Sequence, residues 1–90
     1  MQIEFDAGKR DATLALRGLD FADAPLVFDG LHFTAEDLRE GHAEQRFITI
    51  GMLRERMVVV VWTPPGEVRR IISMRKANER EQQKYARRLA

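Results

Sequence analysis

The hydrophobic and polar positions near the amino terminus predict a short strand followed by a helix. Residues 2–5 alternate between polar and apolar side chains, as a half-buried strand does. Asp6 is a favourable N-cap, and residues 9–17 are rich in helix-favouring types. The main apolar side chains of this helical segment are Leu14 and Leu16.

A second, shorter helix follows a glycine stop. Gly18 is expected to end the first helix, and Asp20 can cap a helix over residues 21–28, whose apolar residues share one face. Pro25 is tolerated in that helix only near its first turn or at a bend. Asp29-Gly30 then indicates a turn.

Three stronger strands occupy the second half of the chain. They cover residues 46–53, 57–63 and 68–74. The β-branched run over residues 58–61 is typical of a central strand that is buried on both faces. Arg54-Glu55 and Pro64-Pro65-Gly66 form short links, and short links between neighbouring strands predict an antiparallel meander.

The remaining segments carry weaker signals. Residues 31–34 are a possible strand, residues 35–44 are expected to form a polar loop, and residues 78–89 are predicted to be a helix. The apolar stripe of that helix is thin, with Glu81 on the same face; it comprises Ala77, Tyr85 and Leu89. Helices grouped before an antiparallel sheet predict an α+β fold in one domain over residues 1–90, with an N-terminal strand, two helices packed on the sheet and a C-terminal helix.

Charge is distributed unevenly along this chain, whose formal net charge is only +1. Residues 69–90 carry eight cationic and two acidic side chains, whereas residues 1–68 carry seven and twelve. A basic carboxyl-terminal end suggests an anionic partner, such as phosphate or an acidic protein surface. The chain has no cysteine, which excludes a thiolate zinc site and a cysteine nucleophile. We expect neither a signal peptide nor a membrane span, and a cytoplasmic location.

Several familiar chemistries find little support in the spacing of polar residues. His32 and His42 lack a nearby ligand-spaced partner, so no metal site is expected. Ser73 falls within a strand rather than at a strained turn, which favours a packed or hydrogen-bonded hydroxyl over a nucleophile. The acidic segment over residues 36–40, with Glu44, could hold a hard cation, but a solvated loop is the favoured interpretation because regular ligand spacing is missing.

The arginines are the more informative candidates. Strict strand alternation predicts that one face of the third strong strand carries Arg69, Ile71, Ser73 and Arg75. The other face would carry Val68, Arg70, Ile72 and Met74. Arg46 can lie beside this strand only if the pairing register allows it. Guanidinium groups arranged in this way can clamp phosphate, although ordinary rim arginines paired with the acidic half of the chain are the alternative.

Two aromatic residues have both a structural and a functional interpretation. Tyr85 lies one helical turn after Glu81, so the pair could provide stacking or proton transfer. The favoured interpretation is that Tyr85 pins the helix to the sheet. Trp62 ends an apolar strand and is expected in a core or an interface.

Taken in order, these residues resemble a known family. The matching pieces are Phe5-Asp6-x-x-Lys9, Gly18-x-x-Phe21, Ala24-x-x-Val27-Phe28, Glu44-x-Arg46, Gly51 and Arg70-Ile71-Ile72-Ser73-x-Arg75-x-Ala77-x-x-x-Glu81-x-x-x-Tyr85. Together they resemble the BrnT toxins, the ribonuclease half of a bacterial type II toxin–antitoxin pair. The resemblance covers nearly the whole chain and implies a RelE-like fold, RNA cleavage without a required cofactor, and a BrnA-type ribbon-helix-helix antitoxin. Operator DNA would be bound only through that antitoxin.

The chain also departs from the family pattern. Relatives often have Trp where this chain has Phe5, Asn at the position of Thr13, and Lys-His where this chain has Leu16-Arg17. If that Lys-His pair serves catalysis in relatives, activity here is weakened. A non-catalytic module that binds nucleic acid or antitoxin therefore stays open, as does a small structural subunit that pairs through a strand edge.

The resemblance implies a metal-free reaction in which the ribose 2′-hydroxyl is the nucleophile. The arginines expected to hold phosphate are Arg46, Arg70 and Arg75, with Arg75 first. The available proton-transfer groups are Glu44, Glu81 and Tyr85. Further RNA contacts are expected from Lys9, Arg69 and Lys76.

Overall fold

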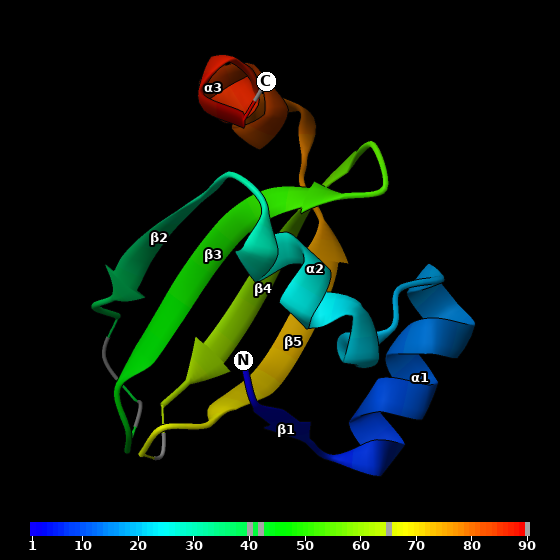
Figure 1. The fold of residues 1–90 in the computed structure, drawn as a ribbon, viewed down its shortest axis with the longest axis vertical. Helices are drawn as coiled ribbons and strands as arrows, with labels where there is room; N and C mark the ends of the chain where they lie inside the picture. Colours follow the sequence, from blue (N-terminus) through cyan, green and yellow to red (C-terminus); the bar gives the residue numbers. More distant parts are fainter. Residues whose placement is uncertain (40, 42, 65, 90) are drawn as a thin grey trace.

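The structure, a computed structural model, describes residues 1–39, 41, 43–64 and 66–89 and has the predicted α+β composition (Figure 1). Its elements in chain order are β1 (Ile3–Phe5), α1 (Ala7–Arg17), the 3-10 turn η1 (Phe21–Asp23), α2 (Ala24–Asp29), β2 (His32–Asp37), β3 (Arg46–Leu53), β4 (Arg56–Thr63), β5 (Arg69–Lys76) and α3 (Glu79–Leu89). No described helix has the length and apolar content needed to cross a membrane.

The strands form one sheet in the order β1-β5-β4-β3-β2. The antiparallel meander of β3, β4 and β5 is confirmed, and its first link turns through two residues with positive φ, Arg54 and Glu55. The second predicted link includes Pro65, which lies outside the described residues. The predicted sheet was antiparallel, but β1 pairs in parallel with β5. Parallel neighbours need a long connection, and α1, α2 and three further strands provide it here.

The predicted helix signals are confirmed at three positions. The Asp6 carboxylate accepts a hydrogen bond from the Lys9 backbone N–H at 2.9 Å, so α1 begins at Ala7, earlier than the apolar pattern indicated. Gly18 ends α1 in the left-handed conformation, with φ of 69°. Asp20 caps η1 through the Ala22 backbone N–H.

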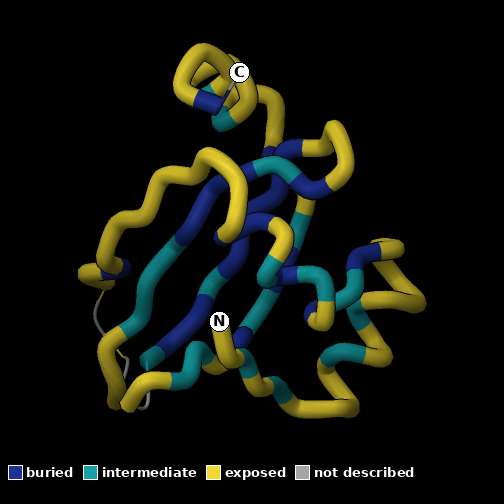
Figure 2. Tube along the Cα trace, in the orientation of Figure 1, coloured by how far each residue is buried: buried dark blue, intermediate teal, exposed yellow. Residues whose placement is uncertain are grey.

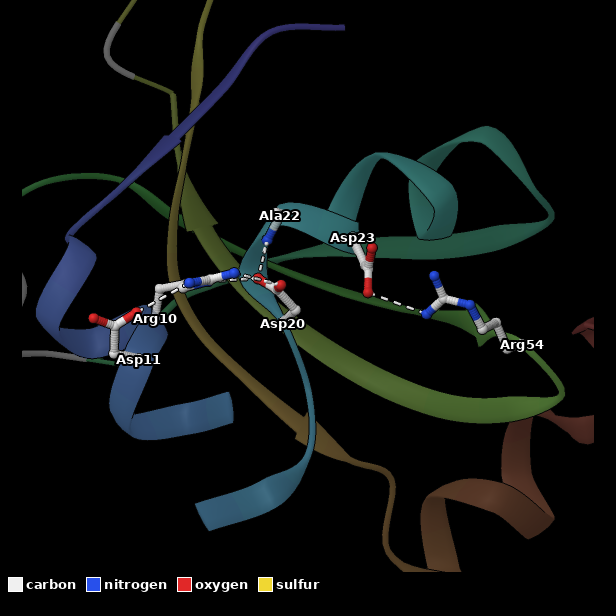
Figure 3. Close-up of polar contacts among 6 residues, drawn as sticks. All are labelled: Arg10, Asp11, Asp20, Ala22, Asp23 and Arg54. Atoms are coloured by element: carbon white, nitrogen blue, oxygen red, sulfur yellow. Dashed lines mark hydrogen bonds and ion pairs between the residues drawn. The ribbon is translucent and has the colours of Figure 1, made fainter. Parts of the chain in front are cut away.

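The helix α1 is held mainly by polar contacts. None of its residues is buried, and Leu14 and Leu16 are 39% and 85% exposed. The Arg10 guanidinium instead donates two hydrogen bonds to the Asp20 carboxylate, at 2.9 and 2.8 Å, and Figure 3 shows it reaching from α1 toward η1. On the side of the sheet, Arg17 Nη1 donates to the backbone carbonyl of Met74 at 2.9 Å.

Two apolar clusters lie on opposite faces of the sheet, and β4 contributes to both, as its β-branched run predicts. Figure 2 shows that the trace of the central strands is largely buried. The larger cluster lies under α2 and η1 and includes Leu19, Phe21, Ala24, Val27, Phe28, Leu53, Val58, Val60, Trp62, Ile71 and Met74. The Trp62 indole N–H donates to Thr49 Oγ1 at 2.8 Å, so this tryptophan is a core residue. The smaller cluster joins the other face to α3 and includes Ile50, Met57, Val59, Ala77 and Leu89.

The strand β2 is longer than the sequence predicted. Residues 35–37 were expected in a polar loop, but they continue the pairing of β2 with β3 as far as Asp37 opposite Arg46. The register pairs Ala35, Glu36 and Asp37 with Ile48, Phe47 and Arg46. At the end of the strand, the Asp37 carboxylate accepts local hydrogen bonds from the Arg39 guanidinium. Glu40 of the predicted loop lies outside the described residues.

Candidate functional site

A β-bulge in β5 decides which arginines share a face of the sheet. Thr63 and Trp62 pair with Arg70 and Ile71, but the next residue of β4, Val61, pairs with Ser73. Ile72 is therefore an extra residue, and the alternation shifts by one position after it. The prediction that Arg69 and Arg75 share a face is wrong for this reason.

The bulge instead brings Arg70, Ser73 and Arg75 to one face. Their partners on β4 are Thr63, Val61 and Val59, and directly paired residues point to the same side of a sheet. This side, which α3 covers only in part, is called the open face here. The helices α1 and α2 do not cover it (Figure 1).

Arg46 belongs to the same face and lies across from Arg70. Continuing the β3–β4 register by one residue from Phe47 and Trp62 sets Arg46 opposite Thr63, which itself pairs with Arg70. Two strand spacings separate the two arginine backbones, about 10 Å. Arg70 Nε donates to Glu4 Oε1 at 2.9 Å, whereas Arg46 Nε is buried and has no hydrogen-bond partner among the described residues.

Arg75 lies further along β5 and is fixed by α3. Its Nη1 and Nη2 donate to the two carboxylate oxygens of Glu81 at 2.8 and 2.9 Å. Glu81 also accepts the Asn78 backbone N–H, and Asn78 Oδ1 accepts the Glu81 backbone N–H, both at 2.8 Å. This capping box begins α3 and holds Glu81 over the sheet. The Arg75 side chain stays 43% exposed and that of Glu81 22% exposed.

Electrostatics at this pair favour two full charges. The hydrogen bonds from Arg75, together with that from Asn78, hold the pKa of Glu81 below its ordinary value. The same contact with Glu81 raises the pKa of Arg75. Glu81 is therefore ionised at neutral pH and has a reduced affinity for a proton.

A groove of about 320 Å³ separates α3 from β2 and β3 beside this pair. Its lining is made by Phe33, Ala35, Ile48, Ile50, Arg80, Glu81, Lys84 and Tyr85. The rings of Tyr85 and Phe33 lie 5.5 Å apart, so Tyr85 does pack α3 against the sheet. Arg88 of α3 also lies over the Phe33 ring, 5.1 Å from its centre.

Other predicted site residues lie apart from the open face. The Arg69 guanidinium is 4.4 Å from the ring centre of Phe28 and 4.5 Å from that of Trp62, on the helix-covered face. Lys76 pairs with Val58, whose side chain faces the same helices. Lys9 is on α1, beyond the edge of the sheet (Figure 1).

The acidic and histidine candidates do not gather into one site. Glu44 is exposed two residues before Arg46, while His32 Nδ1 lies 2.8 Å from the Gly30 carbonyl. Within the described ranges, no three His, Asp or Glu side chains gather so that they could hold a metal ion. His42 lies outside those ranges.

Sequence reasoning missed two residues that shape the site. Asn78 positions Glu81, and the pattern Asn78-x-x-Glu81 before α3 is a capping-box signal that could have revealed it. Thr63, buried between Arg46 and Arg70, became visible only through the strand register. Together the open-face arginines provide planar, permanently charged donors of the kind that bind phosphate oxygens.

Comparison with known proteins agrees with this picture. A search of curated proteins found no match. A family model described as "Ribonuclease toxin, BrnT, of type II toxin-antitoxin system" matches residues 5–81. This range includes Arg46, Arg70, Arg75 and Glu81, whereas Tyr85 follows it. Because the match covers most of the sequence, the chain belongs to the BrnT family of ribonuclease toxins.

Proposed function

We propose that this toxin cleaves RNA without a metal ion and that the arginines of the open face bind the phosphates of the substrate. The observation that carries the proposal is the bulge at Ile72, which puts Arg70 and Arg75 on the same face as Arg46. Arg70 and Arg75 pair with residues four positions apart on β4, about 14 Å along the strand. This separation is too wide for a single phosphate and suits two phosphates that are not adjacent in an extended strand.

The proposed reaction is a transesterification within the RNA. The 2′-oxygen attacks the adjacent phosphorus while a base accepts the 2′-hydroxyl proton, and the bond from phosphorus to the 5′-oxygen breaks. An acid protonates that leaving oxygen. The products are a 2′,3′-cyclic phosphate and a 5′-hydroxyl end. Negative charge develops on the phosphorane oxygens, where fixed guanidinium groups stabilise the transition state.

Arg75 is the best-prepared residue for this task. Its Nη groups make three hydrogen bonds, two with Glu81 and one with the Lys76 carbonyl. A guanidinium has five N–H donors, so Nε–H and one Nη2–H remain for a phosphate. Glu81 fixes the orientation of the guanidinium before substrate binds, which lowers the entropic cost of catalysis.

In the absence of a positioned histidine among the described residues, the candidates for proton transfer are the groups that remain available: Glu44, Glu81 and Tyr85. The lowered pKa of Glu81 weakens it as a base, so we assign it first a positioning role toward Arg75. Glu44 lies next to the Arg46 end of the open face, and Tyr85 has a phenol that can donate a proton.

The test is cleavage of a defined RNA by the purified chain in excess EDTA, with end-group analysis of the products. Arg75→Ala should reduce the rate about 100-fold or more, because one well-placed transition-state donor is removed. Arg75→Lys should recover only part of the rate, since an ammonium cannot form the two-point contact. Arg87→Ala, which removes an exposed charge of α3, is the matched control. Wild-type rates in Arg75→Ala would refute this site.

We further propose that a BrnA-type antitoxin neutralises the toxin by covering the groove under α3. The family name establishes an antitoxin partner in general terms. The groove combines an apolar floor with cationic side chains from α3, which fits a segment that carries both apolar and acidic residues. Repression of the operon would then depend on the DNA-binding domain of the antitoxin.

This proposal predicts a large thermal shift on complex formation. The antitoxin binds only the folded toxin, so the complex should melt well above free toxin. Phe33→Ala should reduce that shift, whereas Leu26→Ala, an exposed apolar position on α2, should leave it unchanged. Equal melting temperatures for free and mixed toxin would contradict the proposal.

A non-catalytic relative that binds RNA or antitoxin is the second candidate. The observation that favours it is Leu16-Arg17, which stands where relatives often have Lys-His, together with the contact of Arg17 with the Met74 carbonyl. Folded protein that leaves RNA intact both in EDTA and in a translating extract would favour this second function. Cleavage in the extract alone would identify a ribosome-dependent enzyme.

A further inference from the structure

A second cationic cleft lies at the edge of β5, next to α1. Lys9, Thr13 and Arg17 are spaced by four residues and share one stripe of this helix. With Ser73 they line a cleft of about 210 Å³, whose other walls are Ala12, Leu16, Phe21 and Ile72. The stripe thus faces the part of β5 where the bulge occurs.

The acidic residues nearest to this stripe are engaged elsewhere. Asp6 accepts the backbone N–H of Lys9 as the N-cap of α1. Asp11 and Asp20 both bind the Arg10 guanidinium, and Figure 3 shows that cluster extending from α1 toward η1. No Asp or Glu is among the described residues that line the cleft, so the charges of Lys9 and Arg17 are not neutralised within it.

The topology leaves this edge of the sheet accessible. Pairing of β1 with β5 ends at Phe5 opposite Ile71. Beyond that point, the Arg17 guanidinium donates a hydrogen bond to the Met74 backbone carbonyl of β5. This contact uses one of five guanidinium N–H donors. The other donors of Arg17, the Lys9 ammonium and the hydroxyl group of Thr13 are groups of the kind that bind phosphate oxygens in proteins.

We infer that the cleft of Lys9, Thr13, Arg17 and Ser73 is a phosphodiester-binding subsite that continues the open face around the edge of β5. Ser73 connects the two surfaces, because it lies between Arg70 and Arg75 along the open face and also lines the cleft. A single-stranded RNA bound to the arginines crosses β5 at this serine and places a phosphate against α1. The inference rests on the proposed function and names a further substrate contact of the same site.

The test is the salt dependence of binding to a fluorescein-labelled 2′-O-methyl oligonucleotide, which cannot be cleaved because its 2′-oxygen is blocked. Removing one cation that binds a phosphate should reduce the slope of log affinity against log salt by about 0.7 for a single strand. The variant Lys9→Gln/Arg17→Gln should therefore lower the slope by about 1.4 and weaken binding at low salt. Arg87→Gln, which removes one exposed cation outside the cleft, is the charge-matched control for the single variant Lys9→Gln.

Two further variants keep the test decisive if removal of the Arg17–Met74 hydrogen bond unfolds the protein. Lys9→Gln alone should lower the slope by about 0.7, and Arg17→Lys should retain the wild-type slope because the charge remains. Circular dichroism establishes folding of each variant. Slopes equal to wild type in Lys9→Gln and in the double variant would overturn the inference, whatever the cleavage result.

Failure of the proposed function gives a different pattern. In that case the wild-type protein leaves unmodified RNA intact and Arg75→Ala binds RNA as wild type does, while the slope still falls in the Lys9 and Arg17 variants. Loss of cleavage in Arg75→Ala with unchanged slopes in the α1 variants would retain the arginine site and reject the cleft.

Discussion

Gly51 allows α2 to approach the sheet closely, and Gly51→Ala should destabilise the protein. A Cβ at this position would lie 2.7 Å from Val27 Cγ1, 3.2 Å from His32 Cβ and 3.4 Å from the Leu31 carbonyl oxygen. The first distance is too short for two carbon atoms. Val27 is fully buried and cannot rotate its methyl group into solvent, so α2 must shift away from β3.

The expected magnitude combines two opposing effects. Overpacking of a tight core costs about 1–3 kcal/mol. Replacing glycine at a position with ordinary strand geometry returns about 0.4–1 kcal/mol by restricting the unfolded chain. The net loss is thus about 1–2 kcal/mol, or a decrease in Tm of roughly 5–15 °C for a domain of this size.

Urea unfolding of a double-mutant cycle tests the cause as well as the magnitude. Val27→Ala alone opens a cavity and destabilises the protein, but in the Gly51→Ala background it also removes the clash. The two substitutions together should therefore cost less than the sum of their separate effects, with a coupling of at least about 1 kcal/mol. A neutral Gly51→Ala, or strictly additive effects, would refute the packing argument.

Three further predictions follow from single contacts. Trp62→Phe removes the hydrogen bond of the buried indole N–H and should lower the free energy of unfolding in urea by roughly 1–2 kcal/mol. Arg75 lowers the pKa of Glu81 in the folded protein below the ordinary value of 4.5. The stabilisation by this carboxylate is therefore present above pH 4.5 and is lost as the pH falls through the pKa of the folded state. Glu81→Gln should reduce the pH dependence of the free energy of unfolding in that range. The hydrogen bonds from Arg10 lower the pKa of Asp20 from 3.8 to about 2. Asp20→Asn should therefore reduce the change in the free energy of unfolding between these pH values. An unchanged pH dependence would argue that the Arg10–Asp20 pair does not hold α1 in place.

Local signals were sufficient to predict most elements of the fold. Asp6, Gly18 and Asp20 act within one turn of the backbone, so their effects do not depend on distant residues. The meander followed from short links and from a central strand that is apolar on both sides. The extension of β2 to Asp37 was missed because its polar residues resemble a loop and only pairing with β3 makes them a strand.

The candidate site could be predicted in composition but not in arrangement. The sequence pattern identified Arg46, Arg70 and Arg75, yet alternation assigned Arg70 to the wrong side relative to Arg75. A bulge arises from pairing between two strands, and nothing in the local run Arg69–Lys76 marks Ile72 as the extra residue. Likewise, the contact of Arg17 with Met74 joins residues that are far apart in the sequence.

The uneven coverage of the sheet leaves the arginine face partly open, as the proposed function requires. On the opposite face, α2 and η1 contribute large apolar side chains, and even Arg69 is used there to cover aromatic rings. On the open face, α3 contributes Tyr85 and Leu89 to a smaller cluster. This cluster lies near the Arg75 end of β5, where Ile50 pairs with Val59, rather than at the end with Arg46 and Arg70.

Arg46 provides a further observation that bears on the proposed binding role of this face. Its Nε is buried without a hydrogen-bond partner among the described residues, a situation that usually costs about 1–3 kcal/mol. A protein selected for stability alone would replace such a donor with an apolar side chain of similar volume, since that change removes the penalty. Under the proposed function, a phosphate that reaches Arg46 once its side chain turns outward would satisfy this donor, and the relieved cost would add to the affinity for RNA.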